Sequence, residues 1–365
     1  MANSLFDPIE LGRYTLKNRI LMAPMTRGRS DADGAPQDIV AQYYGQRAEA
    51  GLIITEAVAV SRLGHGWPGA PGLYTDHQQA EWAKVANSIH SAGGRVFMQL
   101  WHMGGAVIPD YIDGAQSVAP SGVALSGEIP DRKGNPTAFV TPRALTRAEI
   151  VNIIRDFSNS AERAVAAGID GVEIHAANSF LIDQFLRDST NHRTDEYGGT
   201  VANRARFLLE IVDDMAARIG ADRVGVRISP TNAVFGISDS DPKALFSHVA
   251  VALSERELAY LHVLEPSNES DSFMATTNPT LADHLRQAYA GTFILNGGLD
   301  LKAGTAALVE GRADAVAMGA PFIANPDLVT RLAEGIPLAA PDQSTFYTPG
   351  PEGYSDYPNA QTAAA

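Results

Sequence analysis

Short apolar runs alternate along the chain with longer segments in which apolar residues recur at the three- and four-residue spacing of a helix. The apolar runs cover residues 20–23, 52–60, 96–100, 171–175, 224–228, 260–264, 292–295 and 315–318. The helical patterns cover residues 38–50, 79–92, 147–167, 201–218, 242–253, 279–288, 302–310 and 327–334. Eight predicted strands, each followed by a predicted helix, indicate an α/β fold in which a parallel sheet closes into a (β/α)8 TIM barrel. The alternative, a doubly wound open sheet, usually has fewer strands.

One segment, residues 103–146, breaks this alternation because it is rich in Gly and Pro and shows little periodicity. At its end, Thr146 and Glu149 have the spacing of a capping box, which predicts the start of the next helix. A loop of this length inside a compact domain is usually functional. We therefore expect one barrel domain over residues 1–360, in which 103–146 is a long capping excursion after the third strand. Residues 361–365 are expected to form a disordered tail.

Composition narrows the function classes. The 365 residues include no cysteine, which excludes disulfides, a thiolate nucleophile and cysteine-held iron–sulfur clusters. The 28 basic and 42 acidic side chains give a net charge of −14, which disfavours nucleic acid and anionic membranes as partners. Neither a membrane-spanning apolar stretch nor a signal-peptide pattern is present. We expect a cytoplasmic enzyme, monomeric or homo-oligomeric, that acts on a small molecule.

Polar side chains at the predicted strand ends are candidates for the chemistry, because (β/α)8 barrels carry their active sites there. His175 and Asn178 follow the fourth predicted strand and could both donate hydrogen bonds to one carbonyl oxygen, although His175 could equally have a structural role. Arg227 is the cation among these strand ends. It would face an anionic ligand or the electron-rich edge of a flavin, or form a buried ion pair with a carboxylate.

Glycines at the last two predicted strand ends offer backbone N–H groups at the position where barrels commonly bind phosphate, although glycines are also common in turns. They are Gly297, Gly298 and Gly319. No metal is expected, because Glu173 and His175 lack further ligands at comparable positions. A hydrolase is also disfavoured, since neither a nucleophilic serine turn nor a converging carboxylate pair is visible.

Several segments carry motifs that are specific when they occur together and in this order. They are Met22-Ala23-Pro24-Met25-Thr26-Arg27, Gln99-Leu100-Trp101-His102, Gly171-Val172-Glu173-Ile174-His175, Arg193-Thr194-Asp195-Glu196-Tyr197-Gly198-Gly199 and Pro321-Phe322-Ile323-Ala324-Asn325-Pro326. In this combination the chain resembles the old yellow enzyme family of FMN-dependent ene-reductases over nearly its whole length. The resemblance implies FMN as cofactor, NAD(P)H as reductant and an α,β-unsaturated carbonyl compound as substrate.

The resemblance also implies roles for particular residues. One set would surround the FMN: Pro24, Met25, Thr26, Ala57, Gln99, Arg227, Gly297, Gly298, Gly319 and Ala320. A second set would shape the substrate pocket: Trp67, Trp101, Phe235 and Tyr354. His175 and Asn178 would hold the carbonyl oxygen of the substrate.

The chain departs from the family pattern at two positions. Phe180 stands where the family has the tyrosine that protonates the substrate, so water, Tyr354 or the substrate itself must supply that proton. This predicts either an ene-reductase with an altered proton donor or a redox-neutral isomerase or cyclase. Ala320 stands where the family has the arginine that binds the FMN phosphate. Backbone amides and Lys302 remain to hold the phosphate; otherwise the barrel has lost its flavin.

Overall fold

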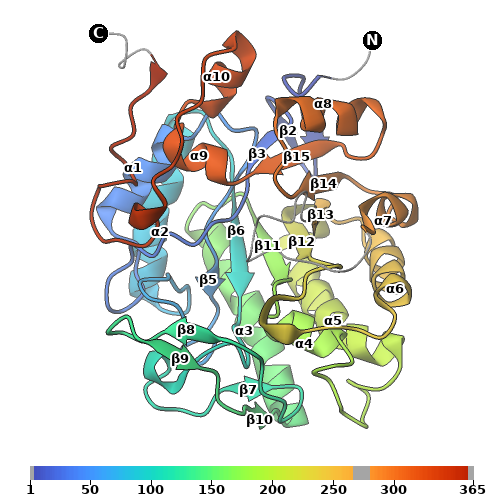
Figure 1. Cartoon of the computed structure of the whole chain (residues 1–365). Coiled ribbons are helices and arrows are strands. Elements are labelled where there is room, and N and C mark those ends of the chain that lie inside the picture. Colours follow the sequence, from blue (N-terminus) through green and yellow to red (C-terminus); the bar gives the residue numbers. More distant parts are fainter. Residues whose placement is uncertain (1–3, 266–279, 361–365) are drawn as a thin grey trace.

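Eight parallel strands close into a barrel in the described part of the chain, residues 4–265 and 280–360 of a computed structural model (Figure 1). In chain order they are β3 (Ile20–Met22), β4 (Ile53–Ile54), β6 (Val96–Trp101), β11 (Gly171–Ala176), β12 (Val224–Ile228), β13 (Tyr260–Leu264), β14 (Phe293–Asn296) and β15 (Ala315–Met318). The pairs β11–β6 and β15–β3 complete the ring. The predicted (β/α)8 barrel is therefore confirmed, and the open sheet is excluded because the ring of these eight strands is closed. The predicted tail, residues 361–365, lies outside the described residues.

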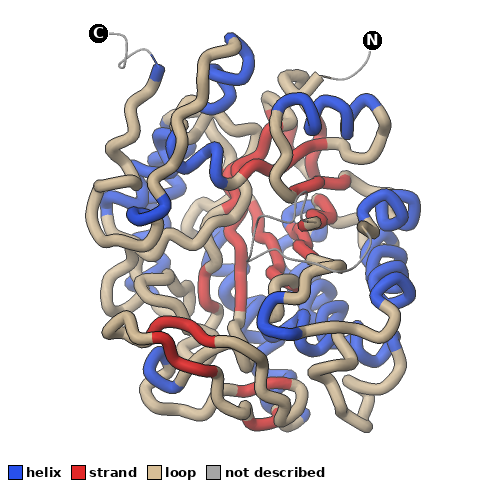
Figure 2. The backbone as a smooth tube through the Cα atoms, in the orientation of Figure 1, coloured by secondary structure: helices blue, strands red, loops and turns tan. Residues whose placement is uncertain are grey.

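The barrel strands occupy the centre of Figure 2 and are surrounded by helices. They are α1 (Asp38–Gln46), α2 (Asp76–Ser91), α3 (Arg147–Ala166), α4 (Leu181–Leu186), α5 (Val201–Ile219), α6 (Pro242–Ser254), α7 (Ala282–Ala288), α8 (Leu301–Val309), α9 (Ala320–Ala324) and α10 (Leu328–Glu334). The predicted capping box starts α3, since the Glu149 amide donates to the Thr146 hydroxyl at 3.3 Å and the Thr146 amide donates to the Glu149 carboxylate at 2.8 Å. Periodicity missed α4 and α9, because five or six residues are too few to display a helical period.

The excursion after β6 contains two small strand pairs. They are formed by β7 (Val118–Ala119), β8 (Glu128–Pro130), β9 (Pro136–Ala138) and β10 (Arg143–Ala144). The β8–β9 hairpin is antiparallel and the β7–β10 pair is parallel; Figure 1 shows both beyond the carboxyl end of β6. The Phe139 ring packs edge-to-face against Phe235 at 4.8 Å, and the Ser126 amide donates to the Phe235 carbonyl at 2.9 Å. These contacts tie the excursion to the loop that follows β12.

The interior of the barrel has an apolar half and a polar half. At the amino ends of the strands, the hairpin of β1 (Ile9–Leu11) and β2 (Tyr14–Leu16) packs under the barrel. The interior there is filled by Leu21, Leu52, Ile54, Phe97, Tyr260, Ile294, Ala315 and Ala317. Two residues farther toward the carboxyl ends of the strands, the next side chains that face the barrel interior are polar. They include Gln99, Glu173, Arg227, His262 and Asn296. This polar layer forms the floor of the candidate site.

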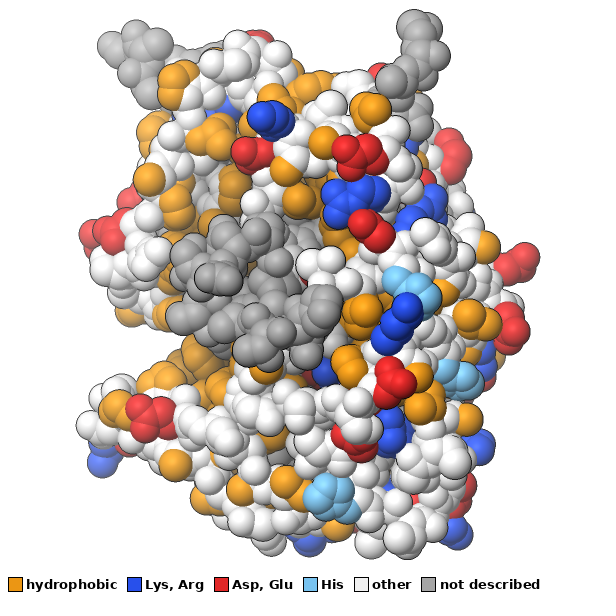
Figure 3. Space-filling view, turned by 45° about the vertical axis from the view of Figure 1, so that its right-hand side comes forward, with side chains coloured by type: hydrophobic (Ala, Val, Ile, Leu, Met, Phe, Trp, Pro, Cys, Tyr) orange, Lys and Arg blue, Asp and Glu red, His pale blue; other side chains and the backbone are white. Residues whose placement is uncertain are grey.

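The outer surface carries charges of both signs. Figure 3 shows acidic and basic side chains interspersed over the right-hand part of one face. Such mixing differs from the basic stripe typical of a nucleic-acid-binding surface. None of the helices in the described ranges combines the length and the apolar character needed to cross a bilayer.

Candidate active site

A cavity of about 1430 Å³ opens at the carboxyl ends of the barrel strands. Its wall contains every site residue predicted from the sequence except one. The residues brought together are Pro24, Met25, Thr26, Ala57, Trp67, Gln99, Trp101, His175, Asn178, Phe180, Arg227, Phe235, Gly297, Gly298, Gly319 and Ala320. They come from strand ends that are far apart in the sequence, so closure of the barrel is what assembles them.

Tyr354 is the exception, and the prediction that it shapes the substrate pocket is wrong. Its side chain is fully buried away from the cavity, with its ring stacked on Tyr43 at 4.0 Å and the Arg29 guanidinium 4.5 Å from the ring centre. Tyr347 lies on the cavity wall instead, edge-to-face with Trp67 at 5.6 Å. Sequence reasoning missed Tyr347 because the C-terminal segment has no periodicity that shows which aromatic side chain turns inward.

Gln99 and Arg227 both line the cavity and are each held by a buried partner. The Gln99 amide nitrogen donates to Glu173 Oε1 at 2.7 Å. Arg227 Nη2 donates to Asn296 Oδ1 at 2.8 Å, and Asn296 Nδ2 donates to the Ala317 carbonyl at 2.8 Å. Arg227 Nε is buried without a partner, and within the described residues no carboxylate lies in direct ion-pair contact with this guanidinium. Arg227 therefore retains hydrogen-bonding capacity for a ligand.

His175 and Asn178 provide neutral hydrogen-bond donors on the cavity wall, where His175 is paired in register with Arg227. Burial, together with the positive field of Arg227 and the proximity of His262, holds the pKa of His175 well below its ordinary value, so the imidazole is neutral. Asn178 Oδ1 accepts a hydrogen bond from Asn232 Nδ2 at 3.0 Å, which leaves the Asn178 amide N–H groups available. Two neutral donors suit a neutral carbonyl oxygen that gains negative charge during a reaction.

Phe180 completes an aromatic wall beside these donors. Its ring lies edge-to-face with Trp101 at 4.8 Å and with His175 at 4.9 Å. The side chain at position 180 thus lies on the cavity wall next to the carbonyl-binding donors. A phenyl ring there carries no exchangeable proton.

Part of the cavity wall is formed by the turns after β14 and β15. Gly297 and Gly298 have φ of 142° and 71°, values that favour glycine, so the turn itself accounts for this Gly pair. Ala320 begins α9 on the wall, and Lys302 in the first turn of α8 also lines the cavity. Asp300 caps α8, because its carboxylate accepts from the Ala303 amide at 2.7 Å. Lys302 forms no ion pair among the described residues.

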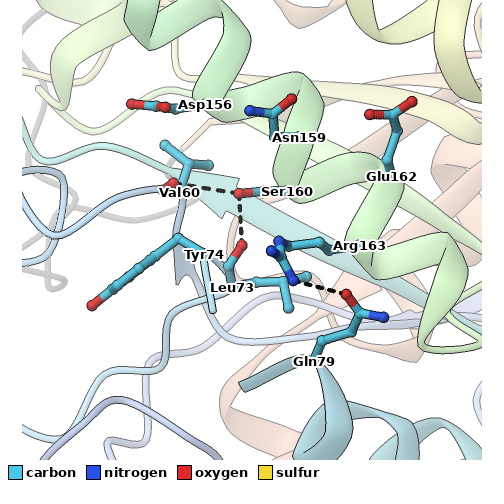
Figure 4. A pocket seen from close by; sticks show the side chains of 9 residues that line it. All are labelled: Val60, Leu73, Tyr74, Gln79, Asp156, Asn159, Ser160, Glu162 and Arg163. Carbon is cyan, nitrogen blue, oxygen red and sulfur yellow. Dashed lines mark hydrogen bonds between the residues drawn. The ribbon is translucent and has the colours of Figure 1, made fainter. Parts of the chain in front are cut away.

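A second cavity, of about 470 Å³, lies outside the barrel between α2 and α3 (Figure 4). Two of its polar side chains donate hydrogen bonds within the wall, and Asn159 and Glu162 are hydrogen-bonded to Arg218 outside it. The Ser160 hydroxyl donates to the Leu73 carbonyl at 2.8 Å, and Arg163 donates to Gln79 Oε1 at 3.0 Å. The larger cavity is the candidate active site, because all but one of the site residues predicted from the sequence line it and none of them lines the smaller one.

Fold and site together define the class. A (β/α)8 barrel whose carboxyl-end cavity combines neutral donors, the Arg227 guanidinium and aromatic walls is suited to a redox cofactor and a carbonyl substrate. In the described ranges no cluster of His, Asp and Glu could hold a metal ion. The sequence model of the NADH:flavin oxidoreductase / NADH oxidase family matches residues 4–339. The chain belongs to this family and is an oxidoreductase with the old yellow enzyme fold.

Individual relatives cover almost the whole chain. Flavin oxidoreductase hxnT of Emericella nidulans is 41% identical over 98% of this chain and 98% of its own. A probable flavin mononucleotide-dependent alkene reductase of Leishmania infantum is 38% identical over 97% of both chains. The solved structure of the old yellow enzyme homologue from Zymomonas mobilis superposes with a TM-score of 0.95 at 45% identity, over 98% of this chain and 99% of that one.

Proposed function

We propose that the chain binds FMN in the large cavity and uses NAD(P)H to reduce the C=C bond of α,β-unsaturated carbonyl compounds. The observation that carries the proposal is the placement of His175 and Asn178, two neutral donors, on the same wall as Arg227. The alkene reductase of Leishmania supports it by similarity. When bound, FMN would accept a hydride from NAD(P)H and pass one to the β-carbon of the alkene.

The residues present fit the isoalloxazine ring better than the phosphate. Arg227 would offer its unpartnered N–H to the electron-rich N1–O2 side of the ring, and Gln99 lines the same cavity. A side chain at position 319 would fill part of the cavity wall, because its Cβ would lie 3.3 Å from the Met25 sulfur; Gly319 leaves this space empty. At position 320 an alanine cannot supply a charge-assisted contact, whose loss is worth roughly ten- to a hundredfold in affinity. We therefore expect FMN to bind, but less tightly than an arginine at position 320 would allow.

His175 and Asn178 would orient and polarise the substrate. Hydrogen bonds from both side chains to the carbonyl oxygen draw electrons from the alkene and make its β-carbon accept hydride. The same bonds then stabilise the negative charge that develops on the oxygen. Because the His175 imidazole is neutral, it holds this oxygen as a hydrogen-bond donor without first protonating it.

The proton for the α-carbon would come from Tyr347 or from water, since Phe180 has none to give. Tyr347 is the tyrosine on the cavity wall within the described residues. It lies at the rim with its ring partly exposed, yet neighbouring groups desolvate the phenol enough to raise its pKa. The hydroxyl therefore keeps its proton at neutral pH. Tyr354, the tyrosine predicted from the sequence, is buried elsewhere.

A redox-neutral isomerase or cyclase is the second candidate function, and Phe180 is the observation that favours it. Slow protonation at the α-carbon would leave time for hydride to return from the substrate. The substrate would then be rearranged without net consumption of NAD(P)H. The balance between the two functions depends on how fast another group delivers the proton.

The test is the visible spectrum of the purified protein, followed by anaerobic titration with NADPH and NADH and then with cyclohexenone. We expect a flavin spectrum that bleaches with the nicotinamide and returns with the enone. A bleached flavin that no enone reoxidises would exclude the reductase. Conversion of an enone without loss of NAD(P)H would favour the isomerase, and a colourless protein that takes up no added FMN would indicate a flavin-free barrel.

A further inference from the structure

A buried carboxylate lies under the cavity floor and is not itself part of the wall. Glu173, in the middle of β11, is fully buried and pairs in register with Gln99 on β6. Glu173 Oε1 accepts from Gln99 Nε2 at 2.7 Å, and Glu173 Oε2 accepts from His262 Nδ1 at 2.8 Å. Both carboxylate oxygens are thus occupied by donors from neighbouring strands.

Glu173 carries its charge in this position. Burial by itself opposes ionisation, but His262, Arg227 and Gln99 together hold the pKa of Glu173 below its ordinary value. Burial also lowers the pKa of His262, which is therefore neutral and donates from Nδ1. An ionised carboxylate accepts hydrogen bonds and donates none.

This constraint determines which end of the Gln99 side chain faces the cavity. A primary amide has one donor end and one acceptor end. Because the carboxylate takes the NH2 group of Gln99, Oε1 is the atom left for a ligand. Arg227, which lines the same cavity, keeps a donor for a ligand, because its Nε has no partner while its Nη2 donates to Asn296. The cavity wall therefore presents an acceptor at Gln99 and a donor at Arg227.

We infer that Glu173 is a positioning residue that fixes the polarity of the Gln99 amide, so that the site selects a ligand with an N–H group beside a carbonyl group. The inference rests on the proposed function, in which that ligand edge is the N3–H and C2 carbonyl of the flavin ring. Without the carboxylate, the amide can turn and present its NH2 group to the flavin N3–H.

The experiment compares the affinities of FMN and N3-methyl-FMN for the protein freed of any bound flavin, measured by quenching of flavin fluorescence. N3-methyl-FMN lacks the N3–H from which Gln99 Oε1 would accept a hydrogen bond. In the Glu173→Gln variant, the amide at position 173 can accept from His262 and donate to Gln99. The Glu173→Asp variant keeps the charge but shortens the side chain by one methylene, which releases Gln99. The matched control is Glu265→Gln, because Glu265 is also a buried carboxylate but accepts from the backbone amides of Leu281 and Ala282.

The unaltered protein should bind FMN more tightly than N3-methyl-FMN, and we expect this affinity ratio to fall about tenfold in both Glu173 variants. In these variants the hydrogen bond between Gln99 and the flavin N3–H is already lost, so methylation of N3 has no further hydrogen bond to remove. The Glu265→Gln variant should keep the full preference. A merely structural role of Glu173 would weaken both flavins equally and leave the ratio unchanged. An unchanged ratio in either folded Glu173 variant would overturn the inference while leaving the FMN site intact. If the unaltered protein binds neither flavin, the proposed function itself fails.

Discussion

The two halves of the barrel interior are built on the same strands but do different work. On β6, Phe97 packs against the rings of Tyr14 and Tyr260, whereas Gln99, two residues later, is held by a hydrogen bond to a buried carboxylate. Strand β14 repeats the change, from the apolar Ile294 to Asn296. A strand advances about 7 Å over two residues. The interior therefore changes from an apolar core to an oriented polar layer within one step.

This contrast separates stability from chemistry. Apolar burial is non-directional and depends on the area removed from water, so the amino half tolerates any arrangement that fills it. Buried polar groups must each find a partner, so the carboxyl half requires one arrangement. Substitutions in the amino half should change the free energy of unfolding, and substitutions in the carboxyl half should change ligand binding and turnover.

The largest expected effect is in the amino half. Replacing Phe97 with Ala leaves a cavity between Tyr14 and Tyr260 and should lower the free energy of unfolding by about 3–5 kcal/mol. Urea unfolding followed by circular dichroism measures it. The kcat/KM of the remaining folded enzyme for cyclohexenone should stay unchanged. A large fall in kcat/KM with stability intact would break the separation between the two halves.

In the carboxyl half, His175→Leu should lower kcat/KM for the enone by about 10²–10³, because a donor to the developing negative charge is lost. Steady-state kinetics at saturating NADPH measure the effect. The matched control is His90→Leu, since His90 contacts Asp170 at 2.9 Å, just before the amino end of the same strand. That variant should change only stability. Equal kinetics in both variants would contradict the role of His175.

Much of this contrast could be predicted from the sequence, because several apolar runs carry a polar residue near their carboxyl end, as Gln99, Arg227 and Asn296 do. The closed barrel and the placement of His175, Asn178 and Arg227 at strand ends follow from that pattern, whereas most other residues of the cavity wall were expected from the family resemblance. The position of Tyr354 did not, since nothing in an aperiodic segment distinguishes it from Tyr347. The small strands of the excursion were also missed. Each has only two or three residues in a segment rich in Gly and Pro, which is too short to show alternating apolar and polar positions. The partner that orients Gln99 depends on strand register, which periodicity does not determine.

A smaller gain of function should come from Phe180→Tyr. The phenol would lie beside His175 and Trp101 and could protonate the α-carbon, so the rate of enone reduction should rise at least about tenfold. Single-turnover reoxidation of the reduced protein by cyclohexenone measures this rate. No gain would mean that another group already delivers the proton, and Tyr347→Phe should then slow the wild-type reaction. If neither variant changes the rate, the proton comes from water.

The smallest expected effect is at the rim of the carboxyl half, where Lys302 is the cation nearest in sequence to the glycine turn after β14. We expect Lys302 to offset part of the negative charge of the phosphate, for which Ala320 provides no cation. The nearby negative charge of Asp300 reduces this effect. Lys302→Ala should therefore weaken FMN binding only about three- to tenfold at low salt, because exposed charge pairs are weak, and the difference should shrink as salt is added. Riboflavin has the same ring but no phosphate, so its affinity should not change. Equal loss of FMN and riboflavin binding would show that Lys302 acts on the ring or on the fold, and no loss of either would leave the backbone amides as the phosphate site.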